Sequence, residues 1–170
     1  ATEKNILNIE ISSDDVDKLA EFALNAQIDL TIVGPEVPLV KGITNKFESL
    51  ELNCFGPSKE AAQIEGSKEF MKKFLSKYKI STAAYESFNN VNMAMKYLKE
   101  SSFPIVIKAD GLAAGKGVTV AKTLSEAEKA VTECLEEKSF GKAGEKIVIE
   151  EFLEGEEASF IVVTDGETIL

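Results

Sequence analysis

The sequence predicts an α/β fold, in which a partial parallel βαβ unit precedes a small antiparallel sheet with two helices. Residues 28–33 and 52–55 are short apolar runs that each stop at a Gly-Pro pair and enclose a helical pattern. Continuous apolar runs of this length are typical of strands buried in a parallel sheet. The second half of the chain has four strand-like runs and two amphipathic helical patterns. We therefore expect units at residues 1–83, 84–150 and 151–170.

The first unit is expected to alternate strands and helices. Residues 6–11 alternate apolar and polar side chains, as a half-buried strand does. The run Ser13-Asp14-Asp15 is placed to cap a helix that continues to about residue 27. Another helix is expected over residues 40–50.

The connector over residues 58–78 is predicted to be helical, with a break near Gly66. Ser67 is well placed to cap its second helix. Lys68 then lies in the first turn, where a lysine opposes the helix dipole and so indicates an anionic partner. A surface lysine without a ligand is the alternative. The apolar side chains of this helix are expected to be buried, and they are Phe70, Phe74 and Leu75.

The second unit is expected to form the antiparallel sheet. Its strands are predicted at residues 84–88, 105–108, 118–121 and 147–152, and its helices at residues 90–100 and 125–137. Residues 142–145 predict a flexible loop. The Asp165-Gly166 pair predicts a hairpin turn between residues 159–163 and 168–170, which opens the third unit.

The composition excludes two classes of partner. The 170 residues carry a formal net charge of −10, with a pI near 4.7. This charge argues against nucleic acid and against anionic membranes, because both are dense in negative charge. No apolar run reaches the roughly 20 residues that a membrane helix needs. Cys54 and Cys134 lack metal-site spacing, so we expect reduced core cysteines in a cytoplasmic protein.

A glycine-rich segment with two lysines joins two of the predicted strands. Its candidate site residues are Lys108, Gly111, Gly115, Lys116 and Gly117. A P-loop does not fit, because three residues separate Gly111 from Gly115 and a glycine follows Lys116. A dinucleotide fingerprint does not fit either, because its spacing is reversed here and the residues after the segment alternate as a strand does. We interpret it as a flap whose backbone amides and lysine cover phosphate groups. A plain hairpin with a loose turn is the alternative.

Acidic side chains follow the last predicted strand of the sheet. Glu150 and Glu157 enclose Phe152 and Leu153. Such a connector can hold an adenine edge through backbone groups and a ribose diol through a carboxylate. In a chain this acidic, a solvated face is the alternative.

Three residues directly follow the first buried parallel strand, and they are Gly34, Pro35 and Glu36. Ligands of α/β sheets gather beyond the carboxyl ends of such strands. We therefore expect these residues to bind substrate, with simple turn chemistry as the alternative.

In this order, the segments resemble the phosphoribosylamine–glycine ligase (glycinamide ribonucleotide synthetase) family of the ATP-grasp superfamily. The resemblance extends over nearly the whole chain, and its strongest blocks are residues 33–39, 54–57, 105–118 and 147–160. The run KADGLAAGKGV at residues 108–118 is specific to this family. A strand followed by a lysine marks only the superfamily.

The resemblance implies an ATP-dependent carboxylate–amine ligase of de novo purine biosynthesis. The glycine carboxylate would attack the γ-phosphate of ATP to give glycyl phosphate and ADP. The amine of phosphoribosylamine would then displace phosphate to give glycinamide ribonucleotide. The family fold makes residues 84–150 an ATP-grasp lid and residues 151–170 the start of the ATP-grasp catalytic domain.

The resemblance also implies a role for each candidate residue. The catalytic residue would be Lys116. The ATP-binding residues would be Lys68, Lys108, Gly111, Gly115, Lys116 and Gly117 on the phosphate side, with Glu150, Phe152 and Leu153 at adenine and Glu157 at the ribose. The phosphoribosylamine-binding residues would be Gly34, Pro35 and Glu36.

Two parts of the family pattern lie outside the sequence. Family members begin with a glycine-rich turn that binds the phosphoribosyl substrate, and they place their Mg²⁺ ligands after the region where this chain ends. We therefore expect an internal part of a longer enzyme, inactive alone, with its Mg²⁺ ligands beyond residue 170 and none within. Another ATP-grasp ligase and a non-catalytic nucleotide-binding module are the alternatives. Nothing in the sequence indicates the oligomeric state.

Overall fold

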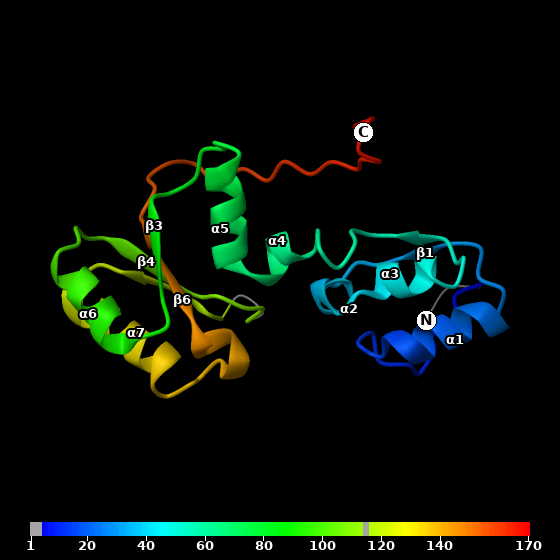
Figure 1. Ribbon diagram of the computed structural model, residues 1–170, viewed down its shortest axis with the longest axis horizontal. Coiled ribbons are helices and arrows are strands. Elements are labelled where there is room, and N and C mark those ends of the chain that lie inside the picture. Colours follow the sequence, from blue (N-terminus) through cyan, green and yellow to red (C-terminus); the bar gives the residue numbers. More distant parts are fainter. Residues whose placement is uncertain (1–4, 114–115) are drawn as a thin grey trace.

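The computed structural model describes residues 5–113 and 116–170, and it confirms the α/β class (Figure 1). A two-stranded parallel sheet contains β1 (Thr31–Ile32) and β2 (Cys54–Phe55). A four-stranded antiparallel sheet follows, with strand order β3-β6-β4-β5. Figure 1 shows the two sheets in two lobes, with helices α4 (Gln63–Gly66) and α5 (Lys68–Lys77) between them.

The N-terminal lobe packs three helices around a small core. The first helix, α1 (Val16–Asn25), begins after Asp15, whose side chain accepts a hydrogen bond from the Lys18 N–H at 3.2 Å. The single helix expected at residues 40–50 is wrong. Two helices, α2 (Glu36–Lys41) and α3 (Ile43–Glu48), meet at Gly42, whose positive φ of 90° ends the first of them. The buried core residues are Ala20, Ala23, Ile43 and Phe47.

The strand expected at residues 6–11 is also wrong, and both parallel strands are shorter than expected. A strand forms only where its backbone groups pair with a neighbour. In the described part of the chain, β1 pairs with β2 alone, over two residues of each strand. Residues 6–11 alternate apolar and polar side chains, but their backbone pairs with no neighbouring strand within the described ranges, so they do not form one.

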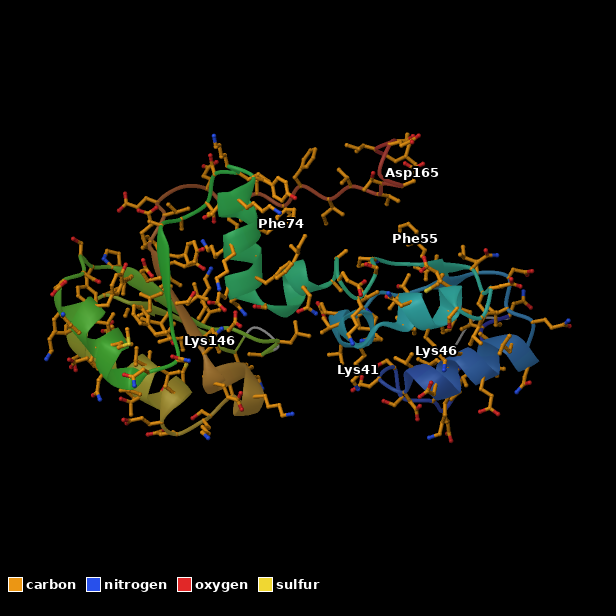
Figure 2. The ribbon with its side chains drawn as sticks, in the orientation of Figure 1. Lys41, Lys46, Phe55, Phe74, Lys146 and Asp165 are labelled. Atoms are coloured by element: carbon orange, nitrogen blue, oxygen red, sulfur yellow. The ribbon has the colours of Figure 1, made fainter. Side chains whose placement is uncertain are left out.

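The connector has the predicted break, but a different buried face. Ser67 caps α5 and accepts a hydrogen bond from the Phe70 N–H at 3.1 Å. Phe70 itself is 42% exposed, whereas Lys72 is only 2% exposed. Phe74, labelled in Figure 2, is half-buried, as is Leu75. The expectation of a buried apolar face is therefore wrong, because α5 packs on a sheet face that carries a buried acid.

The antiparallel sheet is covered on one face by two helices, as predicted. Its strands are β3 (Tyr85–Phe88), β4 (Ile105–Ala109), β5 (Val118–Ala121) and β6 (Ile147–Glu151). The covering helices are α6 (Val91–Lys99) and α7 (Leu124–Leu135), which begin at the caps Asn90 and Thr123. Alternation along β6 sends Ile147 and Ile149 into the core beneath these helices. Glu150 therefore points to the opposite face, where α5 lies (Figure 1).

Two smaller expectations need correction. The loop expected at residues 142–145 is a 3₁₀ turn, η1 (Gly141–Glu145). The expected hairpin near the C-terminus is reduced to one antiparallel bridge, between Thr164 and Ile169. Both cysteines are free thiols, as predicted, and burial raises the pKa of each. None of the helices in the described ranges combines the length and apolar character needed to cross a bilayer.

Asp110 links the antiparallel sheet to the N-terminus of helix α5. It directly follows β4, and its carboxylate accepts hydrogen bonds from the Glu69 N–H at 2.7 Å and the Ser67 hydroxyl at 3.1 Å. Its own backbone oxygen accepts from the Lys68 N–H at 3.1 Å. A carboxylate at a helix N-terminus satisfies free N–H groups and favours the helix dipole. Asp110 therefore fastens α5 to the sheet.

Replacing Asp110 with alanine should lower the free energy of unfolding by about 2 kcal/mol, because a charged helix cap is lost. Urea denaturation of the protein measures this change. Asp17→Ala is the matched control, since Asp17 is exposed and pairs with Lys46 at the surface, where an ion pair contributes little. Equal losses in the two variants would contradict the role given to Asp110.

Candidate functional site

A buried carboxylate between two lysines forms the centre of the candidate site. Glu150 on β6 is 5% exposed. Its Oε2 lies 3.0 Å from the Nζ of Lys72 and 3.0 Å from the Nζ of Lys108. A charge this deep is stable only when it is paired and hydrogen-bonded. Because two ammonium groups face one carboxylate, the cluster carries an excess positive charge, which suits an anionic ligand.

The two lysines differ in how many of their hydrogen bonds the protein uses. Lys72 donates to the Thr82 hydroxyl at 2.8 Å and to the Ala83 carbonyl at 3.1 Å, in addition to Glu150. These three acceptors match the three donors of an ammonium group. Lys108 is 27% exposed at its side chain, and Glu150 is its one acceptor in the described part of the chain. Lys108 therefore has donors to offer a ligand, and Lys72 does not.

Two buried oxygens on the same sheet face have no hydrogen-bond partner within the described residues. They are Glu150 Oε1 and Ser87 Oγ. The register pairs Tyr85 with Glu150 and Ser87 with Val148, so Ser87 and Glu150 are diagonal neighbours on that face. An unsatisfied buried acceptor costs about 1–3 kcal/mol. A ligand that offers an N–H group to Glu150 Oε1 would remove that cost.

Lys68 lies at the junction of α5 and the glycine-rich segment. Its Nζ donates to the Gly111 carbonyl at 3.1 Å. Burial lowers the pKa of Lys68, while Asp110 acts in the opposite direction. In the next position, Glu69 pairs with Lys73 and with Lys146, which Figure 2 places near the N-terminal end of α5. Hydrogen bonds from Lys146 and then Lys73 lower the pKa of Glu69.

A cavity of about 440 Å³ brings together three of the predicted site residues. Glu36 from α2, Lys68 from α5 and Gly117 from the glycine-rich segment all line it. The remaining lining residues are Val37, Glu65, Leu112, Ala113 and Val118. These contributions come from both lobes, so the cavity lies where the two lobes meet.

A larger cavity of about 660 Å³ lies elsewhere, where the start of α1 faces α2 and α3. Lys41 and Lys46, labelled in Figure 2, line it and already form ion pairs with Asp14 and Asp17. It contains none of the predicted site residues, and its lysines are already neutralised. We therefore do not take it as the candidate site.

Two glycines of the glycine-rich segment have a packing role that the sequence analysis did not predict. A Cβ on Gly111 would lie 2.9 Å from the Cα of Ala143, and one on Gly117 would lie 2.9 Å from the Cβ of Ala113. Lys116 is exposed, and Gly115 lies outside the described residues. Close packing of the segment on η1 thus requires glycine at residue 111, with or without a phosphate.

The remaining predicted residues are exposed. Phe152, Leu153 and Glu157 follow β6 in an extended, exposed segment. Gly34 and Pro35 are exposed and directly precede α2. The structure leaves the predicted roles of these five residues as predictions.

The sequence reasoning missed Lys72, Asp110 and Ser87. Lys68 and Lys72 are four residues apart and so share one face of α5, which is the signal that would have found Lys72. Asp110 lies inside the run that carries the family resemblance. Ser87 had no signal, because only the register of β3 against β6 places it beside Glu150.

The described residues contain no group of three or more His, Cys, Asp or Glu side chains arranged to hold a metal ion. Lysine ammonium groups, backbone amides and one buried carboxylate are the chemical groups that the site offers. Such a set can bind and orient a polyphosphate and the N–H groups of a base.

Comparison with protein families covers the whole chain. Residues 1–65 match the family described as "Phosphoribosylglycinamide synthetase, N domain", and residues 66–170 match "Phosphoribosylglycinamide synthetase, ATP-grasp (A) domain". The phosphoribosylamine–glycine ligase of Escherichia coli (strain K12) is 58% identical over 170 residues, and that of Haemophilus influenzae is 56% identical over 169. These matches cover 100% and 99% of this chain, and 40% and 39% of the two relatives.

Solved structures agree in fold. The crystal structure of the phosphoribosylamine–glycine ligase of Thermotoga maritima has a TM-score of 0.74 and 32% identity, and the match covers 89% of this chain and 37% of that one. A biotin carboxylase from Campylobacter jejuni has a TM-score of 0.68 at 19% identity, covers 82% of this chain and 32% of its own, and shows the fold alone. The chain thus spans about two fifths of the length of the curated relatives.

Proposed function

The chain belongs to the phosphoribosylglycinamide synthetase family, and on that premise we propose that the protein containing it ligates glycine to 5-phosphoribosylamine with ATP. The observation that carries the proposal is the buried Glu150, held by two lysines with one oxygen free, beside a glycine-rich segment and Lys68. The products would be glycinamide ribonucleotide, ADP and phosphate, formed through a glycyl phosphate.

Adenine is the base that best fits the free Glu150 oxygen. Its exocyclic amino group can donate to Oε1, whereas guanine would present an oxygen there and repel the carboxylate. Lys108 retains hydrogen-bond donors, which would contact the nucleotide at its α-phosphate and near its adenine. Phe152 and Leu153 would contribute backbone groups to the adenine edge, and Glu157 would accept hydrogen bonds from the ribose hydroxyls.

The phosphates would lie toward Lys68 and the glycine-rich segment. Lys116 is exposed and is our candidate catalytic residue over the β- and γ-phosphates, together with the amides of residues 111–117. Phosphoryl transfer depends mainly on positioning and on neutralising charge, which these groups supply. Closing the segment over the phosphates would also exclude water from the acyl phosphate.

Magnesium enters this proposal as the ion that accompanies ATP. When bound, Mg²⁺ would neutralise charge on the phosphates of ATP. The described residues contain no group of three or more His, Cys, Asp or Glu side chains arranged to hold a metal ion, and we assign it no ligand among them. The cytoplasmic location expected from the sequence likewise remains part of the proposal.

Phosphoribosylamine would bind on the N-terminal side of the cavity shared by Glu36 and Lys68. There, the Glu36 carboxylate can accept hydrogen bonds from ribose hydroxyls or from the substrate amine. Gly34 and Pro35 precede it in the turn that starts α2. This position would bring the amine toward the phosphate end of the nucleotide.

The proposed reaction predicts that the full-length protein releases phosphate from ATP only when glycine and phosphoribosylamine are both present. A phosphate-release assay with each substrate omitted in turn measures this requirement. Release with a different carboxylic acid in place of glycine would favour another ATP-grasp ligase. ATP binding without any release would favour a non-catalytic nucleotide-binding module.

Replacing Lys108 with alanine should weaken ATP binding by about 1.5–3 kcal/mol, the range for a charged hydrogen bond. Titration calorimetry of the full-length variant measures the affinity. Lys129→Ala is the matched control, because Lys129 is an exposed lysine on α7, beneath the opposite sheet face. Unchanged ATP affinity in the Lys108 variant would remove Lys108 from the nucleotide site.

Replacing Glu36 with glutamine should raise the Michaelis constant for phosphoribosylamine and change those for ATP and glycine little. The substitution keeps the size of the side chain and removes the charge that attracts a donor-rich substrate. Glu48→Gln on the exposed face of α3 is the control for a general charge effect. If only the Michaelis constant for ATP rises, Glu36 contacts the nucleotide, and the assignment of Glu36 to the phosphoribosylamine side of the cavity is wrong.

A further inference from the structure

Lys72 is the most deeply buried charged side chain of the site, and the proposed reaction does not use it directly. It is 2% exposed, and its three donors all reach protein acceptors. Its ammonium also lies 5.5 Å from the centre of the Tyr85 ring, which adds a favourable cation–π contact. A lysine with no free donor cannot bind a phosphate, so another role must explain its place beside Glu150.

We infer that Lys72 is a positioning residue, which sets the orientation of Glu150 and thereby selects adenine over guanine nucleotides. This inference rests on the proposed function, since it assumes a nucleotide at Glu150. The evidence is the geometry of one carboxylate. Both lysines contact the same oxygen, Oε2, and leave Oε1 buried without a hydrogen-bond partner among the described residues.

The anchors of Lys72 explain why the carboxylate holds this orientation. Thr82 and Ala83 lie in the segment before β3, and the Thr82 hydroxyl and the Ala83 carbonyl each accept a hydrogen bond from the Lys72 ammonium. The ammonium is therefore fixed in place before it meets Oε2. A carboxylate that is held at one oxygen by two cations has little freedom to rotate, so Oε1 keeps its direction.

Without Lys72, Lys108 would be the sole cation contacting Glu150 in the described part of the chain. The carboxylate could then turn and share both of its oxygens with the Lys108 ammonium. That rearrangement would occupy Oε1 and would also consume donors that Lys108 offers to the nucleotide. Adenine recognition would weaken, although no residue that touches the base had changed.

The test measures ATP and GTP affinities of the full-length protein by titration calorimetry. Lys72→Met keeps the length of the side chain and removes its charge. We expect the preference for ATP over GTP to fall about tenfold, chiefly through weaker ATP binding. Lys73→Met is the matched control, because it makes the same change at the next residue of α5, where the lysine is exposed and pairs with Glu69. The control should keep the wild-type preference.

A double-mutant cycle separates positioning from a purely structural role. If Lys72 acts through Glu150, Lys72→Met should change the ATP-to-GTP ratio in the wild type but not in a Glu150→Gln background. A structural role alone would lower the melting temperature and leave the ratio unchanged. If the methionine variant does not fold, Lys72→Gln retains a hydrogen-bond donor without the charge, and it should show the same loss of preference.

The outcomes also distinguish this inference from the proposed function. If the wild-type protein binds neither nucleotide, both are overturned. If the wild type prefers ATP and the Lys72 variant keeps that preference, the inference is overturned and the proposed function stands. If the ratio falls by the same factor in the wild-type and Glu150→Gln backgrounds, Lys72 does not act through Glu150, and the inference is again overturned.

Discussion

The burial of Glu150 is the constraint on which the rest of the structure depends. A carboxylate inside a protein loses several kcal/mol of solvation unless cations and hydrogen bonds replace water. Here β4 supplies one lysine and α5 supplies the other. The position of α5 on the open face of the sheet is therefore required by electrostatics, in addition to apolar packing.

Asp110 adds a second attachment of the same helix. It caps the N-terminus of α5 from the end of β4, whereas Lys72 joins the middle of α5 to β6. Lys68 belongs to the first attachment through its backbone N–H, and its side chain reaches the backbone of the glycine-rich segment at Gly111. The helix that connects the lobes thus contacts both the buried acid and the segment proposed to cover the phosphates.

The sequence predicted the sheet with its two helices well, because those elements have strong local signals. The strands alternate or run apolar, and the helices have caps at Asn90 and Thr123. It predicted the N-terminal lobe less well. Residues 6–11 have a strand pattern without a paired neighbour, and Gly42 breaks a run that is helical in its periodicity.

The sequence by itself determined the α/β class, the order of the main elements, and the family through the run at residues 108–118. These follow from local periodicity and residue identity, which are encoded in short windows of the chain. Only the tertiary structure decided that Lys72 is buried, that Glu150 has one free oxygen, and that Asp110 caps a distant helix. Each of those facts joins residues about 40 to 80 positions apart, so strand register and helix packing create them, and no local pattern specifies such distances.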